Sequence, residues 1–163
     1  MRLARLLRAF LCQKDHREAM LEIRFKQQVN ASVKDVWNVI INTEQYKQWN
    51  PFVHRCESEF HVGSAIIMHV ELIPGMLLRQ KETIFDNEFE RLLSYGVNLP
   101  LLLKSRREHI LTPLADGKSE YESTFVLKGF LAPMVKFALE KRLRQGFEGM
   151  TNGLIKQAEA LAQ

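Results

Sequence analysis

Apolar and polar residues alternate over residues 21–31 of the chain. The apolar residues share one side of an extended segment, while charged and amide residues fill the other; the apolar set is Leu21, Ile23, Phe25, Val29 and Ala31. A period of two residues is typical of a β-strand that buries one face. The pattern therefore predicts a strand here.

Two short helices are predicted to follow this strand. Ser32 stands three residues before Asp35, which resembles a capping box at a helix N-terminus. The apolar residues that come next have helical spacing: Val36, Trp37, Ile40 and Ile41. A second helical piece begins at residues 42–43 and ends near Trp49, because the residue before Pro51 is disfavoured in the helical region.

The middle of the chain has the pattern of an antiparallel meander. Runs of alternating residues are separated by turn-forming pairs such as Pro74-Gly75, Asp86-Asn87 and Asp116-Gly117. These runs predict further strands over residues 52–60, 66–72, 77–85, 93–99, 104–114 and 119–130. The sheet is therefore expected to contain about six to seven antiparallel strands.

The pattern over residues 132–162 predicts one long helix with Pro133 in its first turn. Its apolar residues recur at intervals of three and four, as on one helical face. Gly146, Gly149 and Gly153 lie along one edge of this face, although glycine inside a helix costs about 1 kcal/mol relative to alanine. We interpret them as a sign of open space beneath the helix; close packing without a cavity is the alternative.

This order of elements predicts an α+β fold. A strongly curved sheet cannot pack flat against a straight helix, so a space is expected between the two layers.

Hydrophobic residues make up 46% of the 163 residues and charged residues 26%, which fits one globular domain. The net charge of +4 is modest and does not imply binding to nucleic acid. Cys12, Cys56 and five scattered histidines lack the spacing of metal ligands, so no metal and no cofactor are expected.

Residues 1–20 are expected to be a basic leader. Residues 2–14 contain three arginines, one lysine and no acid, and on a helix the arginines would lie opposite Leu3, Leu6, Leu7, Phe10 and Leu11. This composition is typical of a helix at a membrane interface, with docking on the protein's own domain as the alternative. Because arginines interrupt every apolar run, a cytoplasmic location is expected, with peripheral membrane association as a further hypothesis.

Several motifs, in order, resemble the START-like (SRPBCC) superfamily and its polyketide cyclase/dehydrase and lipid-transport group. They include Val36-Trp37-Asn38-Val39-Ile40, Trp49-Asn50-Pro51-Phe52, Arg107-x-His109, Gly129-Phe130-Leu131-Ala132-Pro133 and Gly146-Phe147-x-x-Met150-Thr151-Asn152. The resemblance implies a helix-grip fold, in which a curved antiparallel sheet wraps around a long C-terminal helix and an apolar cavity lies between them. Residues 21–163 are therefore expected to form one START-like ligand-binding domain.

The side chains expected around this cavity follow from strand alternation and from the helix face. They are Met68, Tyr95, Arg107, His109, Tyr121, Phe125, Phe147, Met150 and Leu154. The residues on the helix face are equally well explained as ordinary core, since that face must also pack against the sheet.

The polar candidates are more informative. Glu82 and Gln80 share the parity of apolar neighbours and are expected to face inward, where an unpaired carboxylate is costly. Arg107 or His109, which also share an apolar parity, would then pair with Glu82. The alternative is a bulge that reverses the strand and leaves Glu82 in solvent.

The sequence leaves two main functions open. One is the binding, and by extension transport, of a hydrophobic small molecule or lipid. The other is a polyketide cyclase/dehydratase-type enzyme that uses Glu82, Tyr95 and His109 as proton donors and acceptors. Ser123 and Phe125 stand where many relatives carry histidine and glutamate, which makes the cavity more apolar and favours binding. A macromolecular interaction module is a third class, and the oligomeric state is not predicted.

Overall fold

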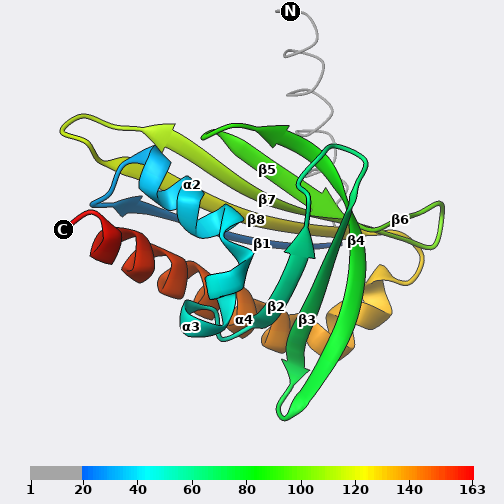
Figure 1. Ribbon diagram of the computed structural model, residues 1–163. Helices are drawn as coiled ribbons and strands as arrows, with labels where there is room; N and C mark the ends of the chain where they lie inside the picture. Colours follow the sequence, from blue (N-terminus) through cyan, green and yellow to red (C-terminus); the bar gives the residue numbers. More distant parts are fainter. Residues whose placement is uncertain (1–19) are drawn as a thin grey trace, which may run out of the picture.

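The computed structural model describes residues 20–163, in which one curved antiparallel sheet wraps around a long C-terminal helix (Figure 1). The strands are β1 (Leu21–Val29), β2 (Val53–Ser58), β3 (Ala65–Ile73), β4 (Met76–Glu88), β5 (Leu92–Gly96), β6 (Asn98–Leu99), β7 (Leu103–Pro113) and β8 (Ser119–Lys128). The helices are α2 (Val33–Ile41), the 3₁₀ turn η1 (Thr43–Gln45), α3 (Tyr46–Trp49) and α4 (Ala132–Leu161). The α+β helix-grip prediction is confirmed.

The eight-stranded sheet has the order β1-β8-β7-β5-β4-β3-β2, and the short β6 pairs with β7 beside this path. All its pairs are antiparallel. In Figure 1 the strands β1, β8, β7 and β5 run across the molecule, whereas β2, β3 and the lower part of β4 turn downward past α4. This bend gives the sheet the concave face that α4 covers.

The predicted helix start at Ser32 is confirmed in atomic detail. The Ser32 hydroxyl accepts a hydrogen bond from the Asp35 backbone N–H at 3.2 Å, and the Asp35 carboxylate accepts one from the Ser32 backbone N–H at 3.2 Å. The Tyr46 hydroxyl then donates to the carbonyl of Ile40 at 2.6 Å, which fixes α3 against α2. Polar groups at the ends of α2 and α3 are thus satisfied locally.

The strand predictions were wrong at two places in the middle of the chain. β4 continues through Asp86 and Asn87 to Glu88, and the turn follows at residues 89–91. The Asp86 carboxylate accepts hydrogen bonds from Ser94 Oγ on β5 at 2.7 Å and from Arg106 Nη2 on β7 at 2.6 Å. This polar residue therefore binds side chains of other strands and does not form a turn. A register shift between Ile84 and Asp86 lets the strand bend and continue.

The second difference is a break in the predicted strand over residues 93–99. β5 ends at Gly96, and β6 begins after Val97. A side-chain carbon at Gly96 would lie 2.0 Å from the backbone oxygen of Ser105, so two backbones approach here as only glycine allows. The sequence showed this glycine but not the strand that passes beside it.

Our interpretation of the helix glycines was also wrong. A Cβ at Gly146 would lie 2.3 Å from the Phe52 ring, and one at Gly153 would lie 2.1 Å from the carbonyl oxygen of Trp49. At Gly149 the nearest atom is Cγ of Pro51, at 3.0 Å. The glycines let α4 approach the segment between α3 and β2, so they indicate close packing and do not line open space.

The core lies between α4 and the concave face of the sheet. α4 contributes Leu143, Phe147, Met150, Leu154 and Ala158 as buried residues, and it also contacts α2 and β1. The predicted leader helix over residues 2–14 lies outside the described residues. Within residues 20–163, no helix is both long enough and apolar enough to cross a bilayer.

Candidate functional site

A cavity of about 260 Å³ lies between the concave face of the sheet and the first half of α4. Most of its wall is apolar and comes from Phe52, Val53, Met68, Val70, Leu72, Val97, Leu103, Phe125, Leu127, Val135, Leu139, Leu143, Phe147 and Met150. The polar part of the wall consists of Gln80, Lys81, Glu82, Tyr95, Ser105 and Arg107. Concave apolar sites with a few polar groups are typical of small-molecule binding.

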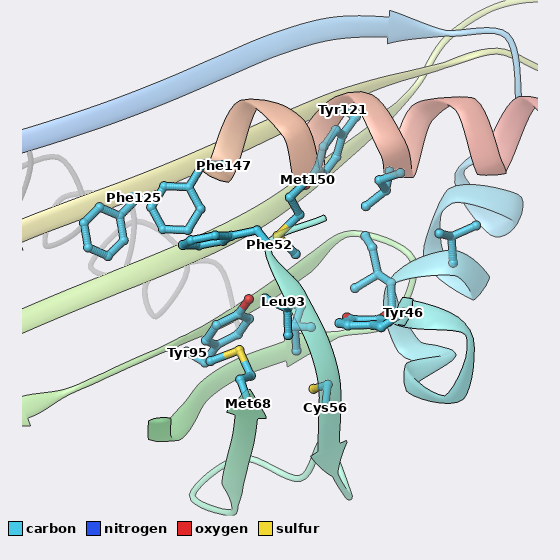
Figure 2. Packing of buried hydrophobic residues seen from close by; sticks show 14 of the residues in the cluster. Tyr46, Phe52, Cys56, Met68, Leu93, Tyr95, Tyr121, Phe125, Phe147 and Met150 are labelled. Atoms are coloured by element: carbon cyan, nitrogen blue, oxygen red, sulfur yellow. The ribbon is translucent and has the colours of Figure 1, made fainter. Parts of the chain in front are cut away.

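Aromatic rings build one side of this cavity, as Figure 2 shows. Phe147 on α4 lies edge-on to Phe52, with ring centroids 5.2 Å apart, and beside Phe125 of β8, at 4.9 Å. In the same view Met68 of β3 points toward Tyr95 of β5. The wall therefore joins residues from distant parts of the chain.

Strand alternation places two polar residues of β4 in the cavity wall. Gln80 and Glu82 face inward with Leu78 and Ile84, as predicted, and the alternative of a reversed strand is wrong. Burial raises the pKa of Glu82 to about 7, an effect that the nearby positive charge of Arg107 partly opposes. At neutral pH this carboxyl group therefore exists in both protonation states.

Arg107 is the most deeply buried charged group of the cavity, with 2% of its surface exposed. Its guanidinium carbon lies 4.3 Å from the centre of the Phe147 ring, a cation–π contact. Nη1 donates to the carbonyl of Thr124 at 3.3 Å, and Nη2 lies 3.8 Å from the Met150 sulfur. Nε has no hydrogen-bond partner among the described residues, which leaves a buried donor unsatisfied.

The predicted pair between Glu82 and Arg107 is not a direct ion pair. Among the described residues, no salt bridge joins Glu82 to Arg107 or to His109; Arg107 acts on Glu82 through its charge at longer range. A carboxyl group and a guanidinium thus face the same apolar cavity without neutralising each other in direct contact.

His109 lies in a row of buried rings behind the cavity wall. Its Nε2 is 3.3 Å from the Tyr95 hydroxyl and its Nδ1 is 2.7 Å from the Tyr121 hydroxyl. Burial, together with the charge of Arg107, holds the pKa of His109 well below its usual range, so the imidazole is neutral. Burial also raises the pKa of the Tyr95 hydroxyl, which remains a hydrogen-bond donor or acceptor at the wall.

The structure brings together six of the nine predicted cavity residues. Met68, Tyr95, Arg107, Phe125, Phe147 and Met150 line the cavity, whereas His109, Tyr121 and Leu154 are fully buried in the core beside it. Sequence reasoning missed Leu103 and Ser105, although they share the parity of Arg107 on β7. It also missed Phe52, which follows a proline and carries no periodic signal.

Ser123 and Phe125 have distinct places in β8. Phe125 lines the cavity, while Ser123 is buried and accepts a hydrogen bond from the Thr151 hydroxyl at 3.3 Å. Among residues 20–163, no cluster of three His, Cys, Asp or Glu side chains is arranged to hold a metal ion.

Comparison with known protein families identifies the family of this chain. Residues 20–154 match the family described as polyketide cyclase / dehydrase and lipid transport. The chain belongs to this family. Its fold is that of the START superfamily, in which both ligand-binding proteins and cyclases occur. No curated protein sequence matches the chain significantly.

Several solved structures have the same fold at low sequence identity. A START superfamily protein from Mycobacterium smegmatis is 18% identical, with a TM-score of 0.66 over 86% of this chain and 98% of its own. The Zhui aromatase/cyclase from Streptomyces sp. R1128 is 15% identical, with a TM-score of 0.71 over 88% and 96%. A norcoclaurine synthase from Thalictrum flavum, solved with a transition-state analogue, is 16% identical, with a TM-score of 0.62 over 88% and 96%.

Proposed function

We propose that the protein binds a hydrophobic small molecule or a lipid in the cavity between the sheet and α4. The observation that carries this proposal is the buried Arg107, whose Nε has no partner among the described residues although the surrounding wall is mostly apolar. An unsatisfied buried donor is costly unless another group accepts its hydrogen bond. A ligand oxygen at this point would remove that cost.

The chemistry of the wall suggests an apolar body with one oxygen-bearing end. Arg107 donates hydrogen bonds, and Glu82, with a pKa of about 7, can donate or accept one at neutral pH. The volume of about 260 Å³ lies just below the range of roughly 300–1,000 Å³ for drug-sized ligands. We therefore expect a carboxylate, ketone or phenol on a small ring system or on one end of an acyl chain.

Paired binding measurements test this proposal. The affinity of a fluorescent fatty acid is measured for the parent chain and for Arg107→Met, with a fatty alcohol of equal length as a competitor. We expect the carboxylate to lose at least about tenfold in affinity in the variant, since hydrogen bonds to a charged group contribute about 1.5–3 kcal/mol. The alcohol should change about twofold or less.

Arg55→Met is the matched control, because this arginine of β2 lies on the surface and 71% of its side chain is exposed. It should leave both affinities unchanged. The proposal fails if the parent shows no saturable binding of any apolar probe, or if both variants weaken binding equally.

A second function, acid–base catalysis of the cyclase or dehydratase type, is supported by one observation. Glu82 has a pKa of about 7, near the value that suits a general acid or base at neutral pH, and Tyr95 lies in the same wall. His109 would support the Tyr95 hydroxyl from behind. Incubation of the protein with a linear poly-β-ketone, followed by mass spectrometry, tests this: a cyclised or dehydrated product must form with the parent and be lost with Glu82→Gln.

We further propose that the protein is cytoplasmic and that residues 2–14 contact anionic membranes peripherally. The support is their sequence alone, in which arginines and large apolar residues would separate onto opposite sides of a helix. Replacement of Arg2, Arg5 and Arg8 by glutamate in the full chain should reduce sedimentation with anionic vesicles.

A further inference from the structure

One end of the folded domain displays large apolar side chains to solvent. Leu101 is 89% exposed, Phe130 82% and Phe137 95%. Leu102 and Met134, beside them in sequence, are also exposed. We refer to these five residues as the apolar end. Large exposed apolar patches are uncommon on a protein that has no binding partner there. We therefore expect a partner to cover this end.

Backbone hydrogen bonds hold the apolar end together. The N–H of Phe130 donates to the carbonyl of Leu101 at 3.2 Å, and that of Leu131 donates to the carbonyl of Leu102 at 3.0 Å. These bonds place the turn between β6 and β7 beside the start of α4, as Figure 1 shows. Leu101, Leu102 and Phe130 are therefore held close together, and Met134 and Phe137 follow on the first two turns of α4.

The same two segments also build part of the cavity. Leu103 follows the turn, Val135 and Leu139 belong to the first turns of α4, and all three line the cavity wall. The apolar end therefore lies at the rim of the proposed binding site. A surface that covered this end would also lie close to a ligand that enters or leaves between β7 and α4.

The charged residues around the apolar end indicate which kind of partner surface it would bind. Residues 98–104 and 128–139 contain Lys104, Lys128 and Lys136 and no acidic residue. Lys104 and Lys136 are exposed. Farther along α4, a surface hollow that includes Phe137 adds Lys141 and Arg144, and its carboxylate, Glu140, is paired with Arg144 at 2.9 Å. The apolar end is thus framed by positive charge.

We propose that the apolar end docks the protein on the surface of an anionic lipid bilayer. Phenylalanine and leucine side chains would enter the interfacial region, and the lysines would meet acidic head groups, each contributing about tenfold or less to binding. Such docking would bring the cavity to the membrane that supplies its ligand, and in this respect the proposal rests on the proposed function. Docking itself does not require a filled cavity.

The basic leader is a less suitable occupant of this end. Met20, the first described residue, lies in the same hollow as Phe137. Residues 1–14 contain four basic residues and no acid. Like charges would oppose their packing against the lysines of the apolar end, and a second copy of this end would meet the same repulsion. An anionic membrane is complementary to both the leader and the apolar end.

Vesicle co-sedimentation of the full chain tests the proposal. The vesicles are phosphatidylcholine alone and a mixture of about 70% phosphatidylcholine and 30% phosphatidylglycerol. The triple variant Leu101→Ser, Phe130→Ser, Phe137→Ser is compared with Val62→Ser, Leu114→Ser, Leu161→Ser, which removes exposed apolar side chains outside the apolar end. We expect the first variant to lose at least about tenfold in partitioning onto the anionic vesicles and the second to stay within about twofold.

Binding should also weaken when the salt concentration is raised, because screening reduces the attraction of the lysines for acidic head groups. Circular dichroism and the thermal midpoint establish that the variants are folded. The proposal is overturned if the parent does not bind the anionic vesicles, or if the apolar-end variant binds them as the parent does. A loss seen only with glutamate at Arg2, Arg5 and Arg8 would likewise assign binding to the leader and overturn it.

The same variants separate this inference from the proposed function. The apolar-end variant should keep its affinity for the fluorescent fatty acid in solution, because its three changed residues do not line the cavity. Retained probe binding with lost vesicle binding supports docking by the apolar end. If the parent itself does not bind the fluorescent fatty acid, the proposed ligand is refuted, whatever the result of the vesicle co-sedimentation.

Discussion

Replacement of Glu82 by glutamine should make the protein more stable at high pH and leave its stability little changed at low pH. The pKa of this carboxyl group rises from 4.5 to about 7 on folding, mainly because it is buried in the cavity wall. The folded state therefore binds the proton more tightly than the unfolded state. It follows that stability is lost as the pH rises from about 4.5 to 7 and the carboxylate forms.

The magnitude follows from the two pKa values. Each pKa unit corresponds to about 1.4 kcal/mol, so the ionised carboxylate costs the folded state at most about 3.5 kcal/mol above pH 7. Glutamine has nearly the same shape and carries no charge, and this cost disappears with it. The free energy of unfolding of Glu82→Gln, relative to the parent, should therefore rise by about 2–3 kcal/mol between pH 4 and pH 8.

Equilibrium unfolding in urea at a series of pH values measures this difference. Glu59→Gln is the matched control, because the Glu59 side chain is 83% exposed and its replacement should give a nearly flat difference. A stability difference for Glu82→Gln that does not vary with pH would refute the reasoning. A change of the opposite sign would mean that attraction to Arg107 outweighs burial.

Further predictions concern packing, helix capping and the buried thiol. Gly153→Ala should destabilise the protein by about 1–2 kcal/mol in urea unfolding, since overpacking against the Trp49 carbonyl exceeds the helix-propensity gain, whereas Gly149→Ala should be nearly neutral. A stabilised Gly153→Ala would show that α4 has room there. Ser32→Ala should cost about 1 kcal/mol by the same assay, through loss of the α2 cap, and an unchanged stability would contradict it. Burial raises the pKa of the Cys56 thiol to about 12, so in a Cys12→Ser background a thiol reagent should react only after denaturation; rapid labelling of the native protein would contradict this.

The sequence by itself determined the features that depend on local pattern. Alternation placed Met68 on the inner face of β3 and Glu82 on that of β4, because successive side chains of a strand point to opposite faces. Ser32 and Asp35 fixed the start of α2 through bonds between residues three apart. The long helix followed from its three-and-four spacing, and the family resemblance joined these elements into a helix-grip fold.

The depth and the partners of each side chain were decided only by the tertiary structure. A period gives the face on which a residue lies, but not how far that face is from solvent or which distant segment covers it. His109 shares its face with Arg107, yet two tyrosines enclose it behind the wall, while Arg107 reaches the cavity and stacks on Phe147 forty residues later in the chain. The glycines of α4 are likewise explained by the close packing of Trp49 and Phe52 against the helix, which no local sequence pattern predicts. Contacts between residues far apart in sequence set burial, and burial sets the pKa values and the unsatisfied donor that give the cavity its chemistry.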